Sequence, residues 1–225
     1  MLPEAVFAEV EAVLSFGVCD DWSFEEDCLR RRPGLPVHAY DPTVGAWLFL
    51  RRTLLRRFGV DRRRGVFLSY LRFFSGNRRH IREWVGNRPG DTRVLRAAER
   101  LGPATRLLVK MDIEGAEYGV LDELVALAPR LACLLIEFHD VPARADQISQ
   151  FVRKLSRTHP VVHLHGNNCA PLAPDGVTPT VIELTFVRAG LLSADAPLFA
   201  GSLPRAGLDQ PNSPALPDYP LSPKP

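Results

Sequence analysis

Three acidic side chains follow the apolar run 107–111: Asp112, Glu114 and Glu117. Acids in the first turn of a helix are stabilised by the helix dipole, by roughly 0.3–1 kcal/mol each, which accounts for Glu114 and Glu117. Asp112 instead follows the run directly, at the position where open α/β sheets bind their ligands. We therefore expect Asp112 to bind a cationic ligand group and to govern ligand affinity, while Glu117 contributes modestly to stability.

Gly17 and Asp41 end the first two apolar runs, 11–16 and 36–40. A glycine at such a point permits a close approach of the backbone to a ligand, although an ordinary turn uses glycine as well. Asp41 follows Gly17 by 24 residues and can either accept hydrogen bonds from both hydroxyls of a ribose or begin an Asp-Pro turn. The chain has no G-x-G-x-x-G motif to hold a pyrophosphate, so a nucleoside without one fits better.

Two histidines are candidate general bases: His139, which follows the apolar run 133–138, and His165. A general base assists a reaction in which a hydroxyl group is the nucleophile. Either histidine could equally be a hydrogen-bonded structural residue. Glu137 and His163 add possible metal ligands, but no spacing among these residues is diagnostic of a metal site, and we expect none.

These candidate residues require a sheet that brings several strand ends together. Apolar runs and helix-like periodicity alternate along residues 1–188. The expected strands are 11–16, 36–40, 66–74, 107–111, 133–138, 161–164 and 181–187. The expected helices start at the S-x-x-E capping box of Ser23, at Thr43, at Asp91 and at Val120, and a last one includes 148–155; Gly59 should end the second. This order predicts an α/β fold with a Rossmann-like, doubly wound, mainly parallel sheet and a terminal antiparallel strand pair.

Charge is distributed unevenly, although the formal net charge is only +2. Residues 51–100 hold 15 arginines and four acids. This segment could bind phosphates, an acidic glycan or nucleic acid, or it could be a solvated helix face. No nucleic-acid motif accompanies it, so we do not expect a nucleic-acid partner. The four cysteines form no C-x-x-C pair, which favours reduced thiols, and no apolar run is long enough to span a membrane. A soluble, cytoplasmic protein is the default expectation.

The chain changes character at residue 189. Residues 189–225 contain eight prolines, which prevent regular helices and strand ladders. We expect a domain over 1–188 and a disordered tail over 189–225, whose deletion should leave the fold unchanged.

The run Lys110–Glu117 resembles the K-[IM]-D-[IV]-E-G-A-E signature of FkbM-type methyltransferases. Residues 15–18, 21–25, 135–139 and 163–168 resemble segments of a eukaryotic-type branch of that family. The resemblance covers roughly 13–188. It implies a Rossmann-like fold, S-adenosylmethionine as the cofactor and O-methylation of a hydroxyl on a small molecule or glycan. The residues expected at the cofactor are Ser15, Phe16, Gly17, Asp41, Asp112 and Glu114.

The sequence departs from the family pattern at three places. Cys19 stands where the family usually carries a second glycine, residues 62–80 match poorly, and the chain begins without the usual helix before the first strand. A catalytically inactive copy that acts as a binding module is therefore the alternative function. The two differ in cofactor binding, which the inactive copy should lack.

Overall fold

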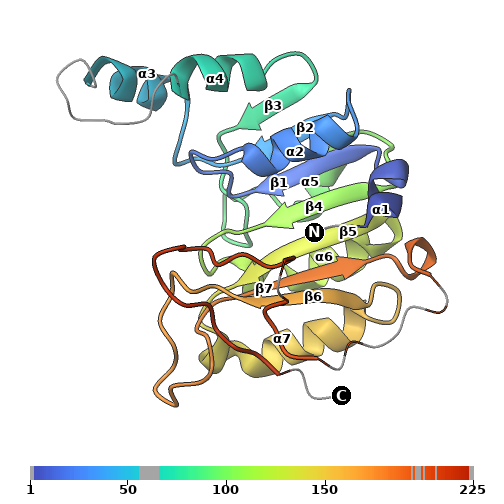
Figure 1. Cartoon of the computed structure of the whole chain (residues 1–225). Helices are drawn as coiled ribbons and strands as arrows, with labels where there is room; N and C mark the ends of the chain where they lie inside the picture. Colours follow the sequence, from blue (N-terminus) through green and yellow to red (C-terminus); the bar gives the residue numbers. More distant parts are fainter. Residues whose placement is uncertain are drawn as a thin grey trace.

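A computed structural model describes residues 3–55, 66–193, 195, 199, 201–205 and 207–222. Its centre is a seven-stranded sheet in the order β3-β2-β1-β4-β5-β7-β6 (Figure 1). The strands are β1 Ala12–Phe16, β2 Val37–Tyr40, β3 Arg78–Ile81, β4 Leu107–Met111, β5 Leu131–Phe138, β6 Val161–Gly166 and β7 Ile182–Val187. Neighbours from β3 to β5 pair in parallel, whereas β7 pairs antiparallel with both β5 and β6. The predicted α/β fold class is confirmed, including the antiparallel pair at one end.

Helices cover both faces of the sheet (Figure 1). They are α1 Glu4–Glu9, α2 Ser23–Arg31, α3 Ala46–Leu55, α4 Val66–Phe73, α5 Val94–Arg100, α6 Leu121–Leu127 and α7 Val141–Leu155. Within the described residues, single turns of 3-10 helix lie at Glu117–Gly119, Ala128–Arg130 and Ala189–Leu191. None of the described helices has the length and apolar character needed to cross a membrane.

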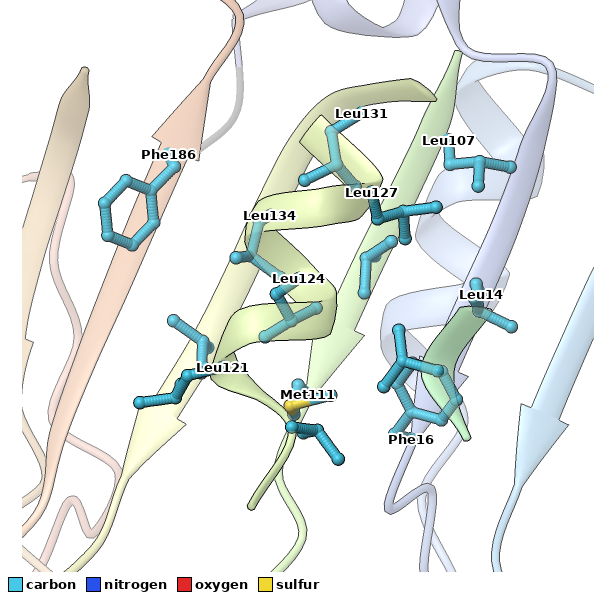
Figure 2. Close-up of a cluster of buried hydrophobic side chains, with 14 of the residues drawn as sticks. Leu14, Phe16, Leu107, Met111, Leu121, Leu124, Leu127, Leu131, Leu134 and Phe186 are labelled. Carbon is cyan, nitrogen blue, oxygen red and sulfur yellow. The ribbon is translucent and has the colours of Figure 1, made fainter. Parts of the chain in front are cut away.

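Successive side chains of each strand point to opposite faces of the sheet, so the core has a layer on each face. In β1, Leu14 belongs to the cluster under α5, α6 and α7, whereas Val13 belongs to the cluster under α1 and α2. Figure 2 shows Leu124 and Leu127 of α6 lying over β4 and β5. Each fully buried leucine contributes roughly 1.5–3 kcal/mol. Both faces of the sheet are therefore fixed by burial, and the strand ends are left to form a site.

The predicted third strand, 66–74, is wrong. Most of this segment is helix α4, and β3 lies further along the chain. Tyr70 and Phe73 are the buried residues of α4, and they stand three positions apart, as helical spacing requires. Strand β3 reads Arg-Arg-His-Ile and lies at the sheet edge with no fully buried residue, so it carries no apolar run.

Helix α2 begins at Ser23 as predicted, but the predicted capping box there and the predicted helix start at Asp91 are wrong. No side-chain cap bonds form at Ser23; instead its backbone N–H donates to Asp21 Oδ1 at 2.9 Å. Helix α5 begins after Arg93 rather than at Asp91, and Glu123 of α6 accepts the backbone N–H of Leu95 at 3.1 Å. In both cases a nearby carboxylate satisfies the free N–H groups of the first turn.

Helix α1 precedes β1, so the expected absence of an upstream helix is wrong. Val6 and Phe7 of α1 are buried against the sheet. Gly59 and the arginines of 56–65 lie outside the described residues.

The Pro-rich tail packs against β6 and the loop after it, contrary to the expected disorder, at least over the residues that the structure describes. His163 Nε2 pairs with Asp209 Oδ1 at 2.7 Å, and His165 Nε2 pairs with Asp218 Oδ2 at 3.0 Å. The amide of the buried Asn168 donates to three tail carbonyls, those of Ser213, Leu216 and Pro217. The tail therefore provides hydrogen-bond partners for His163, His165 and Asn168.

Deletion of residues 199–225 should destabilise the domain. It removes Asp218 from the buried His165, which keeps Glu183, and all tail partners from the buried Asn168, at a combined cost of about 2–3 kcal/mol. For a chain of this size we expect the melting temperature to fall by about 5–10 °C. The carboxylates of Glu183 and Asp218 raise the pKa of His165 to about 9, so the His165 part of this stabilisation is complete below pH 6.5 and is lost as the pH rises through 9. Thermal unfolding of both chains at pH 6.5 and 9.5 measures it; equal melting temperatures at pH 6.5 would contradict the packing.

Candidate functional site

A pocket of about 740 Å³ lies at the carboxyl ends of β1, β2 and β4. Strand order reverses here, because β2 lies on one side of β1 and β4 on the other. Ligands of open α/β sheets bind at such a switch point, and the volume suits a nucleoside-sized molecule. Gly17, Asp41, Asp112 and Glu114 line the pocket, so the structure brings together four of the six predicted cofactor residues.

Gly17 lies in the tight turn after β1, with φ +79°. A Cβ atom at this position would lie 1.6 Å from the carbonyl oxygen of Asp112. The two strand ends are also joined by the N–H of Asp112, which donates to the Phe16 carbonyl at 3.0 Å. Gly17 is therefore required for the close contact between the ends of β1 and β4, which forms one wall of the pocket.

Asp41 is buried and organises two loops at the pocket wall. Its Oδ2 accepts the N–H of Cys19 at 2.7 Å, and its Oδ1 accepts the N–H and hydroxyl of Thr43 at 2.8 and 2.5 Å. A carboxylate offers about four acceptor positions, so one of them is left for a ligand. Asp41 thus starts a turn and also faces a ligand-sized space, while its contact with a ribose stays a prediction.

Ser15 and Phe16 do not line the pocket. The hydroxyl of Ser15 donates to Glu25 Oε1 of α2 at 2.5 Å, and both side chains are fully buried. Phe16 packs against Tyr40 with ring centroids 5.5 Å apart. The geometry supports structural roles for these two residues and no side-chain contact with a cofactor.

Three non-glycine residues of the described chain have a positive φ: Cys19 at +48°, Glu114 at +54° and Asp140 at +52°. They follow β1, β4 and β5 respectively, and all three line the pocket. Left-handed backbone at a non-glycine residue costs roughly 1–2 kcal/mol. Such strain gathers at ligand-binding and catalytic sites, which marks these strand ends as functional.

His139 lies beside the pocket, surrounded by carboxylates. Glu117, which is fully buried, accepts both the backbone N–H and Nδ1 of His139 at 2.9 Å. The opposite ring nitrogen, Nε2, faces Glu114 at 3.5 Å, Glu137 at 3.7 Å and Asp112 at 3.9 Å. The four acids come from the ends of β4 and β5, so the sheet itself assembles this cluster.

The electrostatics of the cluster follow from this crowding. The hydrogen bond to Glu117 raises the pKa of His139 to about 9. Burial, together with the charges of Asp112 and Glu183, raises the pKa of Glu137 to about 7, and burial also raises the pKa of Asp112. His139 is therefore an imidazolium at neutral pH in the free protein, and it must lose this proton before it can act as a general base.

His165 lies apart from this cluster. It pairs in register with Glu183 of β7, which in turn pairs with Glu137 of β5. Two strand spacings thus separate His165 from Glu137, about 10 Å. Since Asp218 of the tail pairs with its ring, the geometry favours the structural alternative for His165.

Comparison with known proteins gives fold-level similarity alone. No protein-family model and no curated protein matches the chain. Among solved structures, a precorrin-6y C5,15-methyltransferase from Geobacter metallireducens aligns at 12% identity and a TM-score of 0.43, covering 82% of this chain and 86% of that one. A 16S rRNA (adenine(1408)-N(1))-methyltransferase variant from Catenulisporales acidiphilia, with cosubstrate SAM, aligns at 17% identity and a TM-score of 0.37, covering 88% and 95%.

Two acids of the site are not among the residues predicted to bind the cofactor or to act as a general base: Glu117 and Glu137, of which Glu137 was considered only as a possible metal ligand. Glu117 was interpreted as a partner of the helix dipole, whereas it holds His139. Glu137 interrupts the apolar strand β5, and a carboxylate in such a run is the signal that could have identified it.

Proposed function

We propose that this chain is an S-adenosylmethionine-dependent methyltransferase of the FkbM type that methylates a hydroxyl group of a small molecule or glycan. The observation that supports it best is the pocket at the switch point, bordered by acids at the ends of β2 and β4 and by three strained residues. The K-M-D-I-E-G-A-E run supplies two of these acids, Asp112 and Glu114.

Within this proposal the cofactor lies along the strand ends. The adenosine ribose binds near Asp41, where one acceptor position is open. The ammonium group lies near Asp112, whose side chain is one-third exposed although its Oδ1 is buried. The other oxygen of Asp112 is therefore the exposed one, and it offers a charge-assisted hydrogen bond to the ammonium.

In the proposed reaction, the acceptor oxygen attacks the methyl carbon of S-adenosylmethionine. The carbon–sulfur bond breaks, and the products are a methyl ether and S-adenosylhomocysteine. The acceptor proton passes to the cluster around His139, which contains the half-buried carboxylate of Glu137 beside the imidazole. Alignment of donor and acceptor supplies most of the rate enhancement in such displacements.

Cofactor binding is the test, because it needs no knowledge of the acceptor. Isothermal titration of the chain with S-adenosylmethionine should show one site. Asp41→Asn, which keeps an oxygen to accept from Thr43, should weaken binding about 10- to 150-fold, corresponding to about 1.5–3 kcal/mol. Asp122→Asn, on the exposed start of α6, is the control and should bind as the unmodified chain does.

The inactive-copy alternative predicts no binding in this titration. Cys19 supports it, since its side chain and left-handed backbone stand where the family usually carries glycine. Absence of binding by the unmodified chain would exclude the methyltransferase proposal, and unchanged affinity in Asp41→Asn would remove the ribose role alone.

A further inference from the structure

The edge of His139 that faces away from Glu117 is surrounded by oxygen atoms. Asp112, Glu114 and His139 each offer one potential ligand atom, and these three atoms lie within 4.8 Å of one another. The distances from His139 Nε2 are 3.5 Å to Glu114 Oε2 and 3.9 Å to Asp112 Oδ1. Two of the three residues follow β4 and the third follows β5.

These distances suit a metal ion placed between the three atoms. A first-row divalent ion binds nitrogen and oxygen ligands at about 2.0–2.2 Å, so two ligand atoms of one ion are at most about 4.4 Å apart. Both measured separations fall within that limit. A cluster with one imidazole and two carboxylates also differs from a solvated group of acids, which contains no nitrogen ligand.

Two further contacts indicate that the imidazole is positioned for a ligand. Glu117 is fully buried and binds Nδ1, which leaves Nε2 directed at the cluster. Metal-bound histidines usually have such a carboxylate behind them, which fixes the ring and increases its basicity. In addition, no hydrogen-bond donor among the described residues reaches the buried Oδ1 of Asp112.

We propose that Asp112, Glu114 and Nε2 of His139 bind a divalent metal ion, with Glu117 as the positioning residue behind the histidine. Mixed nitrogen and carboxylate ligands suit Mn²⁺ and similar first-row ions. Three protein ligands leave coordination positions open to water or to an acceptor oxygen. The site uses the buried oxygen of Asp112, so it does not require the oxygen assigned to the cofactor's ammonium.

The metal site also has a consequence for catalysis, and this consequence rests on the proposed function. An acceptor hydroxyl bound to the metal would lose its proton more readily. Glu137, whose Oε1 lies 3.7 Å from His139 Nε2, is the neighbouring carboxylate outside the three ligands. Metal binding itself is measured without cofactor or acceptor. A failure of one proposal is therefore distinguishable from a failure of the other.

The experiment is a titration of the full chain with Mn²⁺, in which electron paramagnetic resonance counts the free ion. We expect one bound ion per chain, and pulsed resonance should detect one directly bonded nitrogen. His139→Asn keeps an N–H group for Glu117 but lacks Nε2, so it should abolish the nitrogen coupling and weaken binding at least tenfold. Glu117→Gln should weaken binding about 10- to 100-fold.

Two matched controls separate the site from general surface charge. Both control residues lie outside the cluster: His163→Asn removes an imidazole, and Asp122→Asn removes a carboxylate. Both variants should bind Mn²⁺ as the unmodified chain does. The double variant Asp112→Asn, Glu114→Gln should lose the stoichiometric ion while keeping its circular dichroism spectrum. No stoichiometric Mn²⁺ in the unmodified chain, or a bound ion without nitrogen coupling, would overturn the proposal.

Discussion

Replacement of Gly17 with alanine is expected to destabilise the domain by about 2–5 kcal/mol and to distort the pocket wall. The left-handed backbone at this position costs a side chain roughly 1–2 kcal/mol. The added Cβ would also lie 1.6 Å from the carbonyl oxygen of Asp112, so the ends of β1 and β4 must separate. Overpacking of this kind adds about 1–3 kcal/mol. Denaturant unfolding, with S-adenosylmethionine titration of any folded protein, measures both effects.

Gly34 is the matched control. It has φ +84°, and a Cβ placed there meets no atom within 4 Å. Gly34→Ala should therefore show the backbone cost alone, about 1–2 kcal/mol. Similar losses in the two variants would show that the contact with Asp112 is unimportant, and they would weaken the account of the pocket wall.

Glu117→Ala is expected to cost about 3–5 kcal/mol, the range for removal of one partner of a buried ion pair. Its carboxylate accepts the N–H of Gly115 and two N–H groups of His139. Burial alone would raise the pKa of Glu117, but the hydrogen bonds from His139 hold this pKa below its ordinary value. The modest cost expected from the sequence is therefore an underestimate. Denaturant unfolding at pH 7 gives the loss.

Three comparisons make this result specific. Glu114→Ala changes an exposed side chain and should leave stability within about 0.5 kcal/mol. Glu117→Gln keeps an acceptor oxygen and should recover part of the loss. Asp112→Asn removes a charge that burial disfavours, so its melting temperature should be equal or higher. If Glu117→Ala proved as stable as Glu114→Ala, Glu117 would not hold His139.

Strand ends were the part of the site that sequence reasoning could locate. Gly17, Asp41, Asp112 and Glu114 each follow an apolar run, and parallel strands bring such positions to one edge. Ser15 and Phe16 were misplaced because alternate residues of a strand face opposite sides. Both lie one or two positions too early to reach the pocket.

Long-range contacts were the part that the sequence could not show. The pairing of Glu117 with His139 joins residues 22 positions apart, and Asp218 lies 53 positions from His165. Nothing in the local pattern distinguishes a carboxylate at a helix start from one that binds an imidazole. Proline content likewise excludes regular structure in the tail but not packing, because side chains and carbonyls can still bind the sheet.

The position of β7 affects how the chain can fold. It is the last strand in the sequence, yet it lies between β5 and β6. During synthesis, β5 is complete about fifty residues before β7, so its open edge has no partner in that interval. That strand reads LACLLIEF, an apolar segment with one charge and no proline, which is the composition of aggregation-prone edges. The nascent chain therefore passes through a stage at which the edge of β5 is open to pairing with other chains, and β6 can join the sheet only through β7.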